Sequence, residues 1–385
     1  MIYLDHNARG ALRPEARAAI LAALDEAGNA SSVHGAGRAV RARIENARAQ
    51  VATLAGAKPS SVVFTSGGTE ANALALRGAV QGAQEAGERI TRLFVSAIEH
   101  DSVRANAAHL AESAPGLRAS EIPVNGHGVV EPEAVRRALM EGKGRALVSI
   151  MTANNETGVV QPLGEIVAAA KSGGALVHID AVQAAGRITL DFDGLDIDYM
   201  ALSAHKLGAP PGAGALLLKD DAPYAALIAG GGQEMRRRAG TENAPAIAGF
   251  GAAAGTLREF AGEAERVRAL RDGFERKLRE MAPDAVIFGE NAPRLPNTSN
   301  FAIPGMVAET AVIALDLDGV AVSSGSACSS GKVAPSHVLA AMGVAEALAR
   351  CALRVSFGWN STENDAERAL AALARHRARA RAKAA

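Results

Sequence analysis

Between residues 60 and 220, short apolar runs alternate with longer alanine-rich segments of helical period. Because each run is apolar at successive positions, both faces of the strand it predicts must be buried. Strands of this kind are typical of a mainly parallel sheet covered by helices on both sides, so we expect an α/β fold. The predicted strands span residues 61–65, 92–96, 146–150, 175–179, 199–203 and 214–218.

The pattern changes near residue 255, and we place a domain boundary there. A chain of 385 residues with 48% hydrophobic side chains is long enough for two domains. We predict a large domain over residues 15–254 and a smaller α+β C-terminal domain over 255–385, on which an N-terminal arm, residues 1–14, packs. Further elements are expected as helices over 40–54 and 259–281, strands over 286–288, 299–303, 320–322 and 353–357, and a closing Ala/Arg-rich helix.

Charge and cysteine content exclude several classes of function. Acidic and basic residues balance at 41 each, with no long run of one sign, so we expect neither a nucleic-acid partner nor a membrane surface. The first residues lack the apolar core of a signal peptide, and no apolar stretch is long enough to span a bilayer. We therefore expect a soluble, cytoplasmic protein. Two cysteines without CxxC or Cys/His spacing predict neither a disulfide framework nor a metal site.

Polar residues follow the predicted strands at the point where each one ends. In an open α/β sheet, ligands bind beyond the carboxyl ends of the strands, so these side chains are expected to form one site. The first set is a glycine turn that opens a helix, and Gly68 and Thr69 could hold a phosphate there through backbone N–H groups and a hydroxyl. His100 can be a core residue or a ligand contact, and both remain open at this point. The sets are Ser66–Glu70, Glu99–His100, Asn154–Gly158, Asp180–Gln183 and Ser203–Lys206.

Lys206 and Asp180 together suggest a specific cofactor. Each lies at the end of an apolar run, at neighbouring positions of the predicted sheet. A lysine can bind the aldehyde of pyridoxal 5'-phosphate covalently, while an acid keeps its ring nitrogen protonated so that the ring accepts electrons. We therefore predict a pyridoxal-phosphate site built around these two residues.

Four other residues allow simple interpretations. Cys328 lies among small residues in the run Ser323–Lys332 and is expected to be an accessible, reactive thiol, whereas Cys351 precedes an apolar strand and is expected to be buried. Arg354 is the one charge in that strand and either extends outward to solvent or grips a carboxylate. His178, inside a strand, is interpreted as a core residue.

In motif order along the chain, the sequence resembles the cysteine desulfurases of the NifS and IscS type, within the class V aminotransferase family. The resemblance covers essentially the whole chain. The segment Ser324–Cys328 is similar to that of the cysteine desulfurases in which the loop that carries the reactive cysteine is longer. It implies a pyridoxal-phosphate-dependent transferase of fold type I. The matching segments are Tyr3–Asp5, Ser31–His34, Thr65–Glu70, Asn154–Glu156, His178–Gln183, Ser203–Lys206, Gly230–Glu234, Arg238–Asn243 and Ser323–Cys328.

The resemblance implies a role for each matching residue. Lys206 would bind the cofactor covalently and move protons, and Asp180 would pair with the ring nitrogen. Gln183 would hydrogen-bond the phenolic oxygen, and His100 would stack on the ring and, as a catalytic residue, shuttle a proton. Asn155 and Arg354 would orient the carboxylate of L-cysteine, and Cys328 would take its sulfur as a persulfide and release L-alanine. The phosphate contacts would be Gly68, Thr69, Ser203 and His205, with Thr241 reaching in from the neighbouring subunit of a homodimer.

Two positions depart from the family pattern, and several alternatives remain. Arg9-Gly10 stands where Thr-Thr is common, and Ala229 stands where a histidine often occurs. A selenocysteine lyase would use the same scaffold, a class V aminotransferase would give Cys328 no task, and a cofactor-free scaffold would not need Lys206. The sulfur acceptor, such as an iron–sulfur scaffold protein, has no signature in the sequence.

Overall fold

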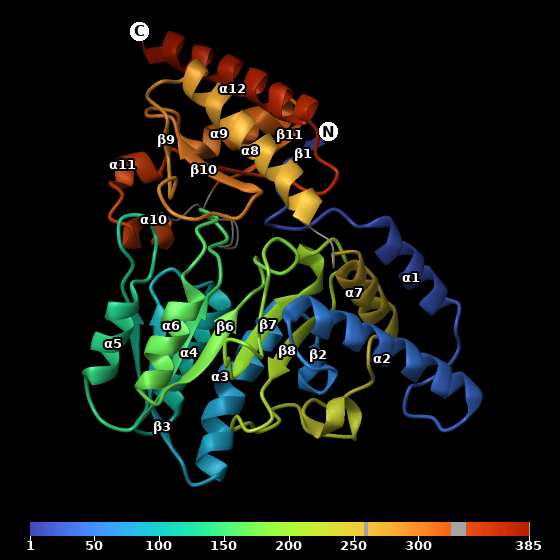
Figure 1. Ribbon diagram of the computed structural model, residues 1–385. Helices are drawn as coiled ribbons and strands as arrows, with labels where there is room; N and C mark the ends of the chain where they lie inside the picture. Colours follow the sequence, from blue (N-terminus) through green and yellow to red (C-terminus); the bar gives the residue numbers. More distant parts are fainter. Residues whose placement is uncertain (258–260, 325–335, 385) are drawn as a thin grey trace.

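A seven-stranded sheet is the centre of the computed structural model, which describes residues 1–257, 261–324 and 336–384 (Figure 1). The strand order is β2-β8-β7-β6-β5-β3-β4, and every neighbouring pair from β7 to β4 is parallel. The two pairs that β8 makes, with β2 and with β7, are antiparallel. The predicted mainly parallel sheet is confirmed. Its strands are β2 (Val62–Thr65), β3 (Ile90–Ser96), β4 (Arg118–Ile122), β5 (Arg145–Met151), β6 (Leu176–Asp180), β7 (Tyr199–Ser203) and β8 (Gly214–Leu218).

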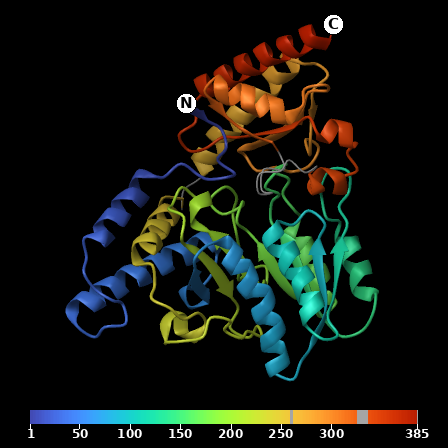
Figure 2. The same ribbon diagram turned by 180° about the vertical axis from the view of Figure 1, so that it is seen from behind.

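Helices cover both faces of this sheet, which explains why its strands are apolar at successive positions. In β5, Val148 joins a core cluster with α2, α5, α6 and α7, whereas Leu147 joins a cluster with α3 and α4 on the opposite face. The view from behind shows the same layers, with α1 lying along α7 (Figure 2). The helices are α1 (Pro14–Leu24), α2 (Gly35–Ala55), α3 (Gly68–Glu85), α4 (Asp101–Ser113), α5 (Pro132–Met140), α6 (Leu163–Ser172) and α7 (Ala244–Thr256).

The C-terminal part forms a smaller unit that contains both chain ends (Figure 1). It has an antiparallel sheet in the order β12-β13-β10-β9 and a separate apolar core. The first strand of the chain, β1, pairs with β11 in this unit, and Leu4 is buried in its core. The elements are β1 (Ile2–Tyr3), α8 (Ala261–Met281), β9 (Val286–Ile287), β10 (Thr298–Ala302), α9 (Ala308–Leu317), β11 (Val320–Ala321), β12 (Ser323–Ser324), α10 (His337–Ala341), α11 (Glu346–Ala349), β13 (Ala352–Ser356) and α12 (Glu363–Ala384).

The division of the chain at residue 255 remains a prediction. The two units are also joined by a fourth apolar cluster, in which Met151 of the large sheet meets Phe288 and Leu339 of the C-terminal unit. In the ranges that the structure describes, no helix combines the length and the apolar character needed to cross a membrane.

Candidate active site

A cavity of about 440 Å³ lies at the carboxyl end of the parallel strands. The structure brings ten of the predicted residues together in its wall, from five strand ends and from β13. Thr241 is exposed and does not line this cavity in its own chain, and Cys328 lies outside the described residues. The ten residues are Gly68, Thr69, His100, Asn155, Asp180, Gln183, Ser203, His205, Lys206 and Arg354.

The N-terminal arm closes the cavity beside Lys206. The Lys206 ammonium donates hydrogen bonds to the main-chain oxygens of Asn7 at 2.5 Å and Ala8 at 2.9 Å. Gly10 lies so close to the lysine loop that a Cβ there would come within 2.8 Å of the Gly208 nitrogen and 3.0 Å of the Lys206 oxygen. The departure at position 10 therefore has a structural reason, since a threonine would force the arm away from the lysine.

Asp180 is held by groups that the sequence analysis missed. Asn72 Nδ2 donates to Asp180 Oδ2 at 2.8 Å, and the Val182 N–H donates to Oδ1 at 2.9 Å. Asn72 also donates to Ser102 Oγ at 2.9 Å, and this hydroxyl lies 2.8 Å from His100 Nδ1. The acid and the histidine are thus oriented by one hydrogen-bonded chain. Asn72 lies in the second turn of α3, after the glycines that open this helix. A polar side chain among apolar neighbours was the sequence signal that could have identified it as a site residue.

The opposite end of the cavity has the features of an anion site. Gly68 opens α3, and a Cβ at this position would lie 2.8 Å from Val182 Cγ2, so only a glycine leaves the cradle open. Ser203 Oγ lies 2.9 Å from His205 Nδ1. Burial, followed by the charges of Lys206 and Arg9, lowers the pKa of His205 to about 4. His205 is therefore neutral at neutral pH, and the positive ends of the α3 peptide dipoles supply attraction for an anion.

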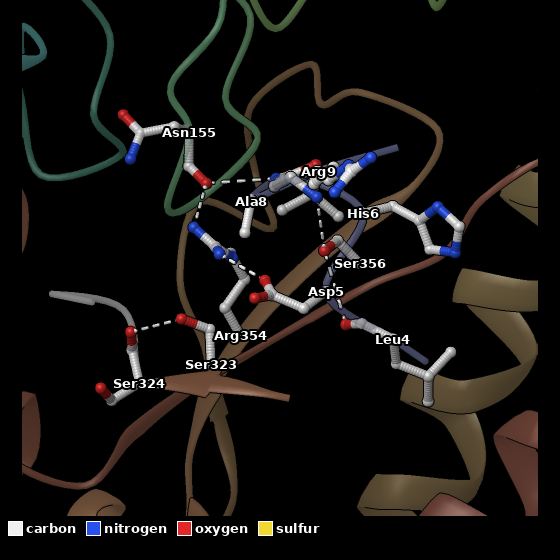
Figure 3. Close-up of polar contacts among 12 residues, drawn as sticks. Leu4, Asp5, His6, Ala8, Arg9, Asn155, Ser323, Ser324, Arg354 and Ser356 are labelled. Carbon is white, nitrogen blue, oxygen red and sulfur yellow. Dashed lines mark hydrogen bonds and ion pairs between the residues drawn. The ribbon is translucent and has the colours of Figure 1, made fainter. Parts of the chain in front are cut away.

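Arg354 does not extend outward, so that alternative is wrong. Its side chain is 3% exposed, and Nη2 lies 2.6 Å from Oδ1 of Asp5 in the N-terminal arm. Nη1 donates to the Asn155 oxygen at 2.9 Å, and Figure 3 shows the guanidinium between these two acceptors. Within the described residues, its buried Nε has no acceptor. The arginine therefore grips a carboxylate of its own chain, and these two contacts use only two of its five N–H donors.

Two buried carboxyl groups lie beside the cavity. The Met151 N–H donates to Glu99 at 2.5 Å, and Ser336 Oγ donates to Glu156 at 2.5 Å. Burial, with the charge of Asp180, raises the pKa of Glu99 well above its ordinary value. Burial raises the pKa of Glu156 to about 7. Burial therefore disfavours the charged form of both carboxyl groups.

A sequence profile of the class-V aminotransferases matches residues 2–369. The chain belongs to the class-V aminotransferase family. A cysteine desulfurase from Cereibacter sphaeroides is 43% identical over 374 residues, which cover 97% of this chain and 94% of the relative. An IscS-like cysteine desulfurase from Mycobacterium tuberculosis is 39% identical over 383 residues, which cover 99% and 97% of the two chains.

The fold of this class-V aminotransferase is also found among solved structures. The X-ray structure of a NifS-like protein from Rickettsia africae matches with a TM-score of 0.87 and 36% identity, covering 98% of this chain and 99% of the other. The family resemblance and the fold class predicted from the motifs are confirmed.

Pyridoxal phosphate, the cofactor that the sequence predicts, fits the residues present. The glycine cradle and the α3 N-terminus suit its phosphate, and the oriented carboxylate of Asp180 suits its ring nitrogen. Asn72 also lines the cavity, and its buried Oδ1 has no hydrogen-bond partner in the part of the chain that the structure describes, so this polar group is left for a ligand to satisfy. No group of His, Cys, Asp and Glu among the described residues could hold a metal ion.

The remaining predictions concern residues away from the cavity. Cys351 is buried in the cluster between the two units, as expected. His178 is fully buried within β6, its Nδ1 lies 2.8 Å from Ser149 Oγ, and burial lowers its pKa to about 3. The interpretation of His178 as a core residue is confirmed, although its buried Nε2 has no hydrogen-bond partner among the described residues.

Proposed function

We propose that this chain is a cysteine desulfurase that uses pyridoxal phosphate to convert L-cysteine to L-alanine and transfers the sulfur to Cys328 as a persulfide. The observation that carries the proposal is the single cavity in which Lys206, Asp180 and Arg354 meet. Relatives named as cysteine desulfurases at 39–43% identity over nearly the whole chain support it.

The cofactor would lie between the glycine cradle and the lysine. Lys206 would bind its aldehyde, Asp180 would hold a proton on the ring nitrogen, Gln183 would donate to the phenolic oxygen, and His100 would cover the ring face. When bound, pyridoxal phosphate supplies an electron sink that weakens the Cβ–S bond of the substrate. The phosphate would be held by Gly68, Thr69, Ser203 and His205, and by Thr241 of a neighbouring subunit.

The substrate would be oriented by its carboxylate. The guanidinium of Arg354 and the side chain of Asn155 would supply donors on the wall formed by β13 and the loop after β5. The Cys328 thiolate would then attack the substrate sulfur, so that an S–S bond forms as the Cβ–S bond breaks. A proton delivered to Cβ completes L-alanine, and no external oxidant is needed.

The biological setting is part of the proposal. A homodimer would complete each site, because Thr241 is exposed and does not line the cavity of its own chain. The persulfide would pass to an acceptor protein such as an iron–sulfur scaffold. We place the reaction in the cytoplasm.

Incubation with L-cysteine tests the proposal directly, with alanine and sulfide measured in the presence of a thiol reductant. The wild-type protein should release both in equal amounts. Cys328→Ser should stay yellow and bind cysteine but release almost no sulfide, and Lys206→Ala should lose turnover. Cys351→Ala is the matched control, because this buried thiol lies outside the cavity, and its sulfide release should match the wild type.

Each alternative has its own outcome in this assay. Equal sulfide from the wild type and Cys328→Ser would rule out persulfide transfer. Amino-group transfer to a keto acid without sulfide would indicate an aminotransferase, and faster turnover of selenocysteine than of cysteine would indicate a lyase for that substrate.

A further inference from the structure

Arg187 is a half-buried cation one turn after Gln183, and the mechanism above gives it no task. No carboxylate lies within 4 Å of it in the described ranges. Burial, followed by the charge of Arg354, lowers the pKa of Arg187 to about 10, so it still carries its charge at neutral pH. A partly buried charge with no carboxylate within 4 Å is costly, so its contacts require an explanation.

The shortest contacts of Arg187 all go to one residue. Nη1 donates to the Gln183 side-chain oxygen at 2.5 Å and to the Gln183 main-chain oxygen at 2.8 Å. Nη2 is 3.4 Å from the His6 oxygen and 3.5 Å from the Lys206 oxygen. The guanidinium thus binds Gln183 closely and the two flanking segments only weakly.

These contacts fix which end of the Gln183 amide faces the cavity. A guanidinium can only donate, so the amide oxygen must face Arg187 and the amide nitrogen must face the other way. One N–H of that nitrogen donates to the Asn7 oxygen at 3.0 Å, and no described residue accepts the second. Gln183 lines the cavity, so it presents a donor there rather than an acceptor.

We propose that Arg187 is a positioning residue that holds the Gln183 amide with its N–H toward the phenolic oxygen of the cofactor. The inference rests on the proposed function, because it requires pyridoxal phosphate in the cavity. Without Arg187, the amide can turn and present its oxygen to another oxygen, which repels it. A donated hydrogen bond favours the ionised phenolic oxygen, so its loss should change the titration of the bound cofactor.

The test measures the visible absorption of the holoenzyme as a function of pH, together with the dissociation constant of pyridoxal phosphate. Arg187→Met should raise the pH midpoint of the absorption change by about one unit and weaken cofactor binding about tenfold. Gln183→Leu should give the same shifts. The double variant should differ little from Gln183→Leu alone, because Arg187 acts through Gln183.

Controls separate positioning from a structural role. Arg271→Met removes a more deeply buried arginine, one that donates to the Leu295 oxygen outside the cavity, and should lower stability without moving the midpoint. Arg187→Lys keeps the charge and one donor, so it should give less than half the shift and serves as the test if Arg187→Met does not fold.

The outcomes distinguish this inference from the proposed function. Additive shifts in the double variant, or midpoints in both Arg187 variants equal to that of the wild type, would overturn the inference. Failure of the wild-type protein to bind pyridoxal phosphate would instead overturn the proposed function.

Discussion

Replacing Asp5 by alanine should destabilise the folded protein, because it removes the only carboxylate that contacts Arg354 within 4 Å in the described ranges. Arg354 is 3% exposed, whereas Asp5 is 21% exposed. Removing one partner of a fully buried pair costs about 3–5 kcal/mol. Since water can partly replace the Asp5 carboxylate, we expect the free energy of unfolding to fall by about 2–3 kcal/mol.

Urea unfolding at pH 7 measures this loss, and the single tryptophan provides a local probe. Trp359 Nε1 donates to the Ala11 oxygen at 2.9 Å, so its fluorescence reports on the arm. The control is Asp318→Ala, because Asp318 pairs with an arginine that is 51% exposed and should lose less than about 1 kcal/mol. Asp5→Asn keeps an oxygen acceptor and should fall between the two. If Asp5→Ala lost no more stability than Asp318→Ala, the arm would not anchor Arg354.

Three further predictions concern burial and space around the site. Glu99→Gln should match the wild type in stability near pH 4 and become more stable than it as the pH rises, by up to about 1.4 kcal/mol per pH unit. The reason is that burial raises the pKa of Glu99 in the folded protein, so that the carboxyl group ionises first in the unfolded chain. The wild type should lose stability as the pH falls below 6.5, because burial lowers the pKa of His178 to about 3 and acid then protonates only the unfolded chain. His178→Phe should not show this loss. Urea unfolding at a series of pH values checks both variants. Gly68→Ala should weaken pyridoxal-phosphate binding about tenfold or more in a fluorescence titration, because its Cβ would lie 2.8 Å from Val182. The control is Gly164→Ala, whose Cβ would have its nearest neighbour at 3.8 Å and which should leave binding unchanged. Equal affinities of the two variants would contradict a phosphate site at Gly68.

The sheet could be predicted because its strands are buried on both faces. A short run that is mostly apolar on both faces is a strong local signal, and six of the seven strands carry it. The seventh, β4, is an edge strand in which Arg118, Ser120 and Glu121 are exposed. A sequence of this kind is equally typical of a loop, and β4 is recognised as a strand only from its hydrogen bonding to β3.

The cavity could be predicted in part for a similar reason. Residues directly after strands, such as Asp180, Ser203 and Lys206, are found from their position in the pattern. The groups that hold them come from elsewhere. Asn72 lies inside a helix, and Asp5 is 349 positions from Arg354, so no local pattern could have paired them.

Asn7 explains why the arm, rather than the sheet, completes the cavity. Its main-chain oxygen accepts from both Lys206 and Gln183, which uses both lone pairs of that carbonyl. Its side chain donates to the Asn155 oxygen and to Thr298 Oγ1 of β10. One residue thus links the lysine, the substrate wall and the C-terminal unit. Because Gln183 and Lys206 bind the same oxygen independently, loss of the Lys206 bond alone would leave the Gln183 bond to hold the arm.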